Sequence, residues 1–247
     1  MISFATAAEV ALIVFVAAAL QRAVGFGFAL LAVPLMAFVV PTKSAVVIVF
    51  LTGSVTSVWL ALRLVHRIEW RTARRLGAGA VVGAPVGVVI LSLVSAMSLR
   101  LVLGVTTSVA AVWIIVSSRR GRARPVEHKR STTFGLGVAS GVLNTSLATS
   151  GPPLVYELRR TGFHGDRFRG TISAVFVISN LIGLPLLALA GLITADDLAL
   201  AVISVLPCVA GFLFGSRIAR RMSPARFAWA VDALLLATGL VTIVKVL

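Results

Sequence analysis

The chain alternates long apolar runs with short polar connections over its whole length. The ten apolar segments cover residues 6–20, 27–40, 44–64, 73–94, 99–117, 132–148, 151–158, 170–190, 197–216 and 227–246. An α-helix needs about 20 apolar residues to cross the hydrocarbon of a bilayer, and most of these runs approach that length. We therefore predict an all-α polytopic membrane protein. The first run has no basic residue before it, which favours a span over a removable signal peptide.

Composition and charge support this interpretation. Hydrophobic residues make up 59% of the chain and charged residues only 13%. The net charge of +15 could suggest a nucleic-acid partner, but the basic residues lie between the apolar segments, so the expected surroundings are a lipid bilayer. The Arg-rich loops follow the third, fifth, seventh and ninth segments. The positive-inside rule then predicts that these loops are cytoplasmic and that both chain ends lie outside.

A polar break interrupts the second half of the chain at Gly141–Pro153, which reads GVLNTSLATSGPP. A helix in lipid cannot lose backbone hydrogen bonds at Gly-Pro-Pro unless protein or water replaces them, so the break indicates a cavity. The alternative is a proline kink stabilised by neighbouring helices. The segment 151–158 is too short to span alone, which favours a hairpin or a broken helix there. Full-span and re-entrant arrangements both stay open.

The first half contains a corresponding break at Gln21–Pro34, which reads QRAVGFGFALLAVP. Superposing Pro34 on Pro153 places Gly25 opposite Asn144. The glycines allow the backbone to approach a ligand closely. Arg22 adds a positive charge, which either pairs with an anion in a cavity or extends to the lipid headgroups from the end of the first helix.

The two halves resemble each other. A shift of 128 residues aligns Glu69 with Asp197 and superposes the GxxxG spacings at 83–87 and 211–215, where small residues permit close helix packing. Each half has five segments, an odd number, so the second half enters the membrane from the opposite side. This predicts two inverted-topology repeats. The predicted division is a repeat at 1–118, a basic cytoplasmic linker at 119–130 and a second repeat at 131–247, with broken or re-entrant helices at segments 1–2 and 6–7.

Two broken segments at corresponding positions of an inverted repeat indicate a substrate site near the bilayer midplane. Free amide groups at the starts of the half-helices favour an anion there. We predict a substrate-binding set of Gln21, Arg22, Gly25, Phe26, Gly27, Asn144, Ser146, Thr149, Ser150, Gly151 and Asn180. Asn180 either contacts the ligand or joins two helices. Asp232 either pairs with an interfacial arginine or carries a coupling proton.

Other classes of function are disfavoured by the residue types present. No histidine lies in a predicted span and Cys208 is the only cysteine, so neither a nucleophile–base pair nor a metal site is expected. We expect no enzyme activity, no cofactor and no metal. An anion channel could share the polar breaks, and the sequence does not separate a channel from a carrier.

Several of these motifs together resemble the TauE/SafE sulfite exporter family, also called the 4-toluene sulfonate uptake permeases. They are GFGFALLAVPLM at the first break, SGVLNTSLATSGPPLV at the second, the polar segment Thr171–Asn180, and GAPVG and GFLFG near the ends of the halves. The resemblance covers essentially the whole chain, although the triple-glycine runs of many members are absent. It implies a bacterial inner-membrane transporter of sulfite, thiosulfate, sulfonates or sulfoacetate, driven by the membrane potential or a proton gradient.

The expected function is therefore a secondary transporter that exports small sulfur-containing oxyanions such as sulfite by alternating access. An importer of thiosulfate or organosulfonates, and an anion channel, are the alternatives.

Overall fold

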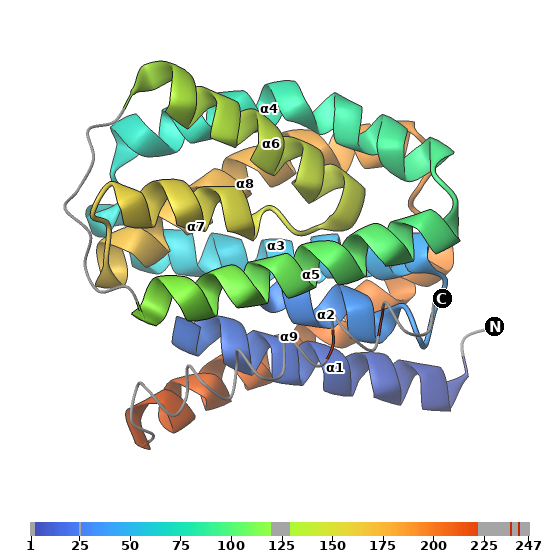
Figure 1. The fold of residues 1–247 in the computed structure, drawn as a ribbon. Coiled ribbons are helices and arrows are strands. Elements are labelled where there is room, and N and C mark those ends of the chain that lie inside the picture. The colour runs from blue at the N-terminus through green and yellow to red at the C-terminus, as the bar shows by residue number, and fades with distance from the viewer. Residues whose placement is uncertain (1–2, 25, 120–128, 222–237, 239–241, 243–247) are drawn as a thin grey trace. The chain divides into compact units, whose positions relative to one another are not determined.

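The computed structural model describes the chain except for residues 1–2, 25, 120–128, 222–237, 239–241 and 243–247. The described part is helical throughout (Figure 1). Its elements are α1 (Phe4–Val24), α2 (Phe28–Met36), α3 (Thr42–Arg63), the short 3-10 helix η1 (Val65–Arg67), α4 (Trp70–Leu93), α5 (Ala96–Arg119), α6 (Arg130–Leu147), α7 (Gly151–Arg160), α8 (Gly165–Leu189) and α9 (Ala195–Arg221). The first nine predicted segments each correspond to one of the nine α-helices, and the tenth lies almost wholly outside the described residues. The prediction of an all-helical, apolar chain is confirmed for the part described.

Five of the described helices are long and apolar enough to cross a membrane. They are Phe4–Arg22, Thr42–Arg63, Trp70–Leu93, Gly165–Leu189 and Ala195–Gly215. In contrast, α2 has 9 residues and α7 has 10, so at 1.5 Å per residue each reaches only about half of the hydrocarbon thickness. The chain thus breaks its helices near both predicted positions.

The helices group into two compact units, and each unit takes segments from distant parts of the chain. Unit 1 consists of residues 1–52, 94–122 and 194–247, and unit 2 consists of residues 53–93 and 123–193. The long helix α3 changes unit after Thr52. This is a division in space, whereas the repeats 1–118 and 131–247 are a division of the sequence, so the repeats stay a prediction.

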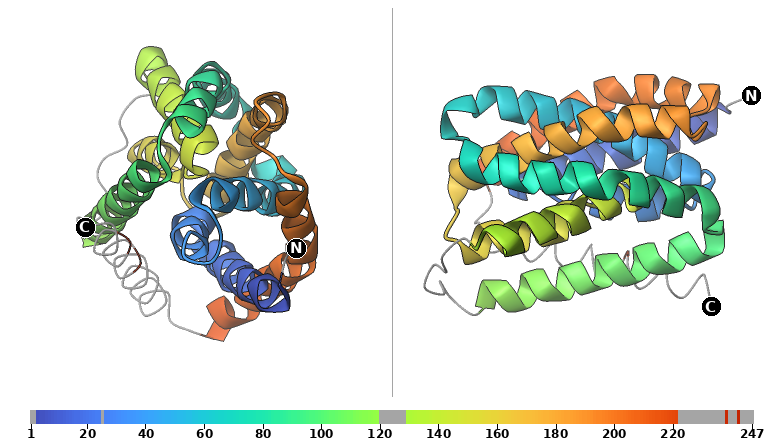
Figure 2. Two further views of the ribbon diagram at one scale, coloured as in Figure 1. Left: turned by 90° about the vertical axis from the view of Figure 1, so that its right-hand side faces the viewer. Right: turned by 90° about the horizontal axis from the view of Figure 1, so that it is seen from above.

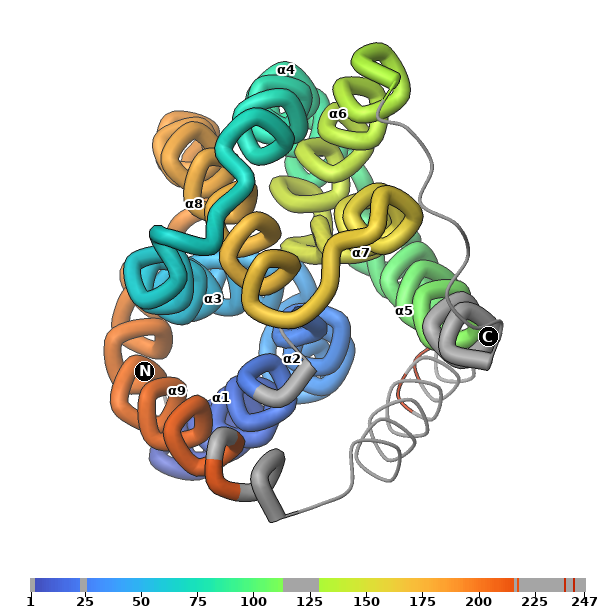
Figure 3. Tube along the Cα trace, turned by 90° about the vertical axis from the view of Figure 1, so that its left-hand side faces the viewer, coloured from blue at the N-terminus to red at the C-terminus, as the bar shows by residue number. Residues whose placement is uncertain are grey.

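In unit 2, α4 packs along α6 and α8, and α7 lies beside α6 and α8 (Figure 2, Figure 3). Glycines allow the α4–α6 approach. A Cβ atom at Gly83 would collide with the Val138 carbonyl of α6, and one at Gly141 would collide with the Ala80 carbonyl of α4. Such close backbone contact is how small residues hold membrane helices together.

In unit 1, glycines likewise allow α1 to pack closely along α9, and α2 contacts α5. Gly211 faces the Phe15 carbonyl and Gly215 faces the Ala19 carbonyl, so neither position has space for a side chain. The prediction that both GxxxG spacings serve close packing is confirmed. Arg100 of α5 fixes the residue after α2, because its Nη2 donates to the Ala37 carbonyl at 2.6 Å and its Nε donates to Thr42 Oγ1 at 2.9 Å.

Candidate functional site

The break between α6 and α7 is an ordered turn in unit 2. Ala148 ends α6 with a φ of 53°, the one positive value of a non-glycine residue in the described part of the chain. Its N–H donates to the Asn144 carbonyl at 2.8 Å, and the N–H of Thr149 donates to the Leu143 carbonyl at 3.1 Å. A left-handed alanine costs about 1–2 kcal/mol. Strained backbone of this kind tends to occur at functional positions.

The start of α7 has few backbone donors. The helix begins at Gly151, and Pro152 and Pro153, which follow, carry no N–H. Proline fits the first turn of a helix because that turn needs no intrahelical donor. The sequence analysis expects free amide groups at the start of this half-helix. Because the two prolines have no N–H, the N–H of Gly151 is the main backbone donor among the first three residues of α7. Hydroxyl groups have to supply most of the remaining donors.

A chain of buried and half-buried polar side chains runs beside this break. Asn144 of α6 donates from Nδ2 to Ser179 Oγ and to Asn180 Oδ1 of α8, both at 2.8 Å. Asn180 in turn donates from Nδ2 to Ser54 Oγ of α3 at 2.9 Å. We call Ser54, Asn144, Ser179 and Asn180 the amide network. The network joins three helices, so the interhelical role considered for Asn180 is present in the structure.

The hydroxyl groups around the break differ in what they contact. Ser140 Oγ donates to the Ser150 carbonyl at 3.1 Å, which ties the turn back to α6. Ser146 Oγ donates to the Val142 carbonyl of its own helix at 2.6 Å. Thr149 is 1% exposed, yet its Oγ1 has no hydrogen-bond partner among the described residues. Thr149 therefore has a hydroxyl available for a ligand or a water molecule.

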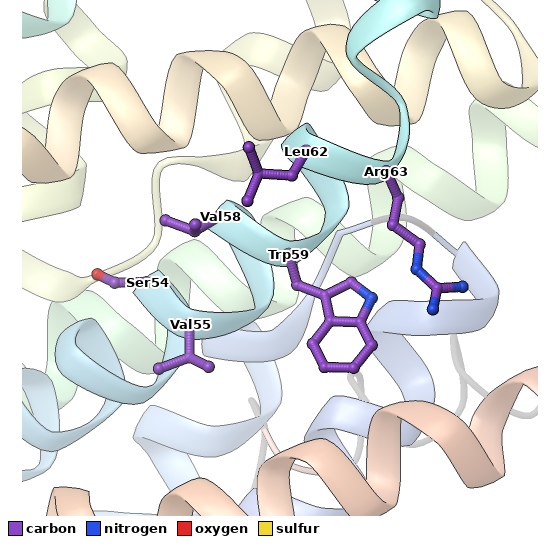
Figure 4. Close-up of a pocket in the computed structure, with 6 residues that line it drawn as sticks. All are labelled: Ser54, Val55, Val58, Trp59, Leu62 and Arg63. Carbon is purple, nitrogen blue, oxygen red and sulfur yellow. The ribbon is translucent and has the colours of Figure 1, made fainter.

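An open surface cavity of about 620 Å³, which we call the α3 cavity, adjoins the amide network at Ser54. Its lining consists of Ser54, Val55, Val58, Trp59, Leu62 and Arg63, all from the second half of α3. Figure 4 shows Ser54 and Arg63 at opposite ends of this row, and nine helical residues separate them by about 13 Å. The Arg63 guanidinium carbon lies 5.3 Å from the centroid of the Trp59 ring, within the range of a cation–π interaction.

Neither Trp59 nor Arg63 belongs to the predicted substrate-binding set. In the sequence, Arg63 reads as the first charge of the basic loop that follows the third apolar segment. The signal in the sequence is their spacing of four, which places an aromatic ring and a cation on one side of an apolar helix.

The first break lies in unit 1. Gly27 precedes α2 with a φ of 98°, a conformation that favours glycine. Gln21 and Phe26 are buried. The Arg22 guanidinium carbon lies 5.4 Å from the centroid of the Phe212 ring of α9, so part of the stabilisation of this charge comes from an aromatic face.

The predicted binding residues thus fall into two sets. Gln21, Arg22, Phe26 and Gly27 belong to unit 1, and Asn144, Ser146, Thr149, Ser150, Gly151 and Asn180 belong to unit 2. Within unit 2 the structure brings Asn144 and Asn180 into direct contact. Gly25 and Asp232 lie outside the described residues. The convergence of the two sets on one ligand stays a prediction.

Comparison with known proteins gives one result for nearly the whole chain. Residues 10–242 match the family model described as Sulfite exporter TauE/SafE. No curated protein and no solved structure matches the chain.

Proposed function

Because the chain belongs to the TauE/SafE sulfite exporter family, whose members are membrane transporters of anions, we propose that it exports sulfite or a related small sulfur oxyanion by secondary transport. The observation that carries this proposal is the amide network beside the α6–α7 break, of which Asn144 and Ser179 are buried. An anion that leaves water needs donors in place of its hydration shell. The Thr149 hydroxyl and the N–H of Gly151 at the start of α7 provide such donors beside the network without introducing a negative charge.

Thr149 is a further proposed ligand contact, and Arg22 contributes under the additional proposal that both breaks face one ligand. The Thr149 hydroxyl has no partner among the described residues, so a ligand oxygen can accept its hydrogen bond without breaking an existing one. Arg22 supplies the full positive charge that the amide network lacks. A guanidinium is planar and can bind an oxyanion through two parallel hydrogen bonds, and that of Arg22 lies against the Phe212 ring.

Alternating access by two inverted repeats is the proposed mechanism, and the glycine contacts support it. The helix before the second break, α6, packs on Gly83 and Gly87 of the first half. The helix before the first break, α1, packs on Gly211 and Gly215 of the second half. Reciprocal pairing of this kind is what a two-fold relation between the repeats would produce. Under the same proposal the Arg-rich loops are cytoplasmic, both ends lie outside, and the membrane is a bacterial inner membrane.

The α3 cavity favours an organosulfonate as the second candidate substrate. Sulfite has only four heavy atoms, whereas about 620 Å³ is typical of a pocket for a larger organic ligand. Val55, Val58 and Leu62 offer an apolar surface between Ser54 and Arg63. A sulfonate with an apolar tail could place its charged group at either polar end.

Transport assays in proteoliposomes test the function directly. We expect the purified chain to move sulfite, and the flux to depend on an imposed potential or pH gradient. Failure of sulfite, thiosulfate and simple sulfonates to move would contradict the substrate class. A unitary conductance in a planar bilayer would favour an anion channel instead.

Substitution of Arg22 tests its role in the site. Removal of one charged hydrogen-bonding group should weaken anion affinity about tenfold or more in Arg22→Gln, with Arg22→Lys intermediate. Equal affinity in Arg22→Gln and the wild type would indicate that the side chain only anchors α1.

A further inference from the structure

Besides the largely apolar α3 cavity, unit 2 contains a polar pocket near the starts of three helices. Its volume is about 470 Å³, and its lining consists of Glu69, Arg71, Thr72, Arg75, Arg130, Phe163 and Arg167. The helix α4 begins at Trp70, α6 at Arg130 and α8 at Gly165, so the arginines lie in or near the first turns of three helices. None of these residues belongs to the amide network or to the α3 cavity.

The positive charge in this basic pocket is only partly compensated. Four arginines and one glutamate line it. The carboxylate of Glu69 pairs with Arg167, with an Nη2–Oε2 distance of 2.9 Å. Arg71, Arg75 and Arg130 have no carboxylate partner within the described part of the chain. The pocket thus holds an excess of three guanidinium groups.

The helix ends add to this positive potential. The N-terminus of a helix carries a partial positive charge, and acidic residues are the ones that stabilise it. Here the first turns of α4 and α6 contain arginine and no acidic residue, which is unfavourable in the absence of an anion, whereas the first turn of α8 contains Asp166 as well as Arg167. The buried Thr72 adds a hydroxyl to the lining. The Arg167 guanidinium carbon lies 4.5 Å from the centroid of the Phe163 ring, which fixes that side chain over an aromatic face.

The pocket also lies at the end of two candidate membrane spans, Trp70–Leu93 and Gly165–Leu189. Trp70, the first residue of α4, is 43% exposed. Exposed tryptophan at the end of a span is typical of the headgroup region of a bilayer. The pocket is therefore at the depth where lipid phosphates occur.

We infer that the basic pocket binds a phosphate group, carried either by an anionic lipid headgroup or by a free phosphate ion. Guanidinium groups bind phosphate through two parallel hydrogen bonds, and several arginines can share one phosphate. Basic pockets between membrane helices are known to hold anionic headgroups. This site is separate from the proposed transport site, and the inference does not depend on which anion is transported.

The experiment uses the full chain reconstituted in phosphatidylcholine, with and without phosphatidylglycerol, and measures the thermal unfolding midpoint. A lipid source predicts a higher midpoint with phosphatidylglycerol. A free-ion source predicts that inorganic phosphate raises the midpoint in phosphatidylcholine alone, whereas chloride at the same ionic strength does not. Absence of both increases, or an equal increase with chloride, would overturn the inference.

Two neighbouring arginines of α4 provide a matched pair. Arg75 lines the pocket, and Arg74 is exposed and does not. Arg75→Gln should weaken the stabilisation by phosphate or phosphatidylglycerol about tenfold in concentration, while Arg74→Gln, with the same change of charge, should leave it unchanged. Equal losses in the two variants would mean that only the general surface charge is sensed. The shift of the unfolding midpoint by phosphate or phosphatidylglycerol should occur whether or not the protein transports sulfite. The outcome of this experiment is therefore independent of the outcome of the transport assay.

Discussion

Thr145 and Thr149 lie four residues apart near the α6–α7 break and use their hydroxyls differently. Thr145 Oγ1 donates to the Ala84 carbonyl at 2.7 Å, which joins α6 to α4. Thr149 Oγ1 is buried without a partner among the described residues. One hydroxyl therefore serves packing, and the other is available to a ligand.

Replacement of each threonine by valine keeps the shape of the side chain and removes the hydroxyl. Thr149→Val should keep the unfolding midpoint and lower anion affinity about five-fold, the effect of about 1 kcal/mol. Thr145→Val should leave the Ala84 carbonyl with one hydrogen bond fewer, lower the midpoint and keep the affinity. Anion titrations and thermal unfolding of both variants provide the measurements. A loss of stability in Thr149→Val without a change in affinity would remove Thr149 from the site.

Most of the residue-level detail could not be predicted from the sequence. The amide network joins Asn180 to Ser54 and to Asn144 across 126 and 36 positions of the chain, and hydropathy carries no information on such pairs. The polar character of Asn144 and Asn180 among apolar residues did select both of them. Arg63 was not selected, because an arginine at the end of a span looks like any other loop charge.

At the scale of elements, the pattern of apolar residues located the helices well. The expected segment 44–64 corresponds to α3 at Thr42–Arg63, and the expected segment 151–158 corresponds to α7 at Gly151–Arg160. Helix length and the positions of glycine and proline are local properties, which explains this success. The partner of each helix is a long-range property, and the GxxxG spacings predicted close packing without identifying the partner helices.

The α4–α6 contact can be tested by one chemical change at two positions. Gly83→Ala places a methyl group against the Val138 carbonyl, whereas Gly135→Ala in α6 places it in open space. Overpacking typically costs about 1–3 kcal/mol, so Gly83→Ala should lower the unfolding midpoint and Gly135→Ala should not. Equal midpoints in the two variants would show that the helices can separate without penalty.

Helix α7 is fixed to α6 by a fully buried carboxylate. Glu157 Oε1 accepts a hydrogen bond from Thr133 at 2.6 Å, and Oε2 lies 2.9 Å from Arg160 Nη2. Arg160→Gln would remove this ion-pair partner from the buried Glu157 carboxylate, and we expect a loss of up to about 3 kcal/mol in unfolding free energy.

The double variant Glu157→Gln/Arg160→Gln removes both charges and should recover part of that loss. A double-mutant cycle on the free energy of unfolding measures the coupling. Additive effects of the two substitutions would show that the pair contributes nothing beyond its separate side chains.

At the scale of the whole molecule, the proposed topology makes a labelling prediction. Cys208 is the only cysteine, so a Cys208→Ala background accepts single new thiols. An impermeant thiol reagent added to intact cells should label Asp196→Cys, which is on the predicted outer side, and should not label His66→Cys until the cells are opened. Both positions are exposed in the structure, so accessibility within the fold does not bias the comparison. The reverse labelling pattern would invert the topology.

Helices of the first half of the chain pack against helices of the second half, and this has a consequence for biosynthesis. Helix α1 packs against glycines of α9, and the glycines of α4 pack against α6 and α8. These partner helices all belong to the second half of the chain, so α1 and α4 are synthesised before the surfaces that cover them. We therefore expect lipid or an insertion chaperone to cover these faces of α1 and α4 until the second half is inserted.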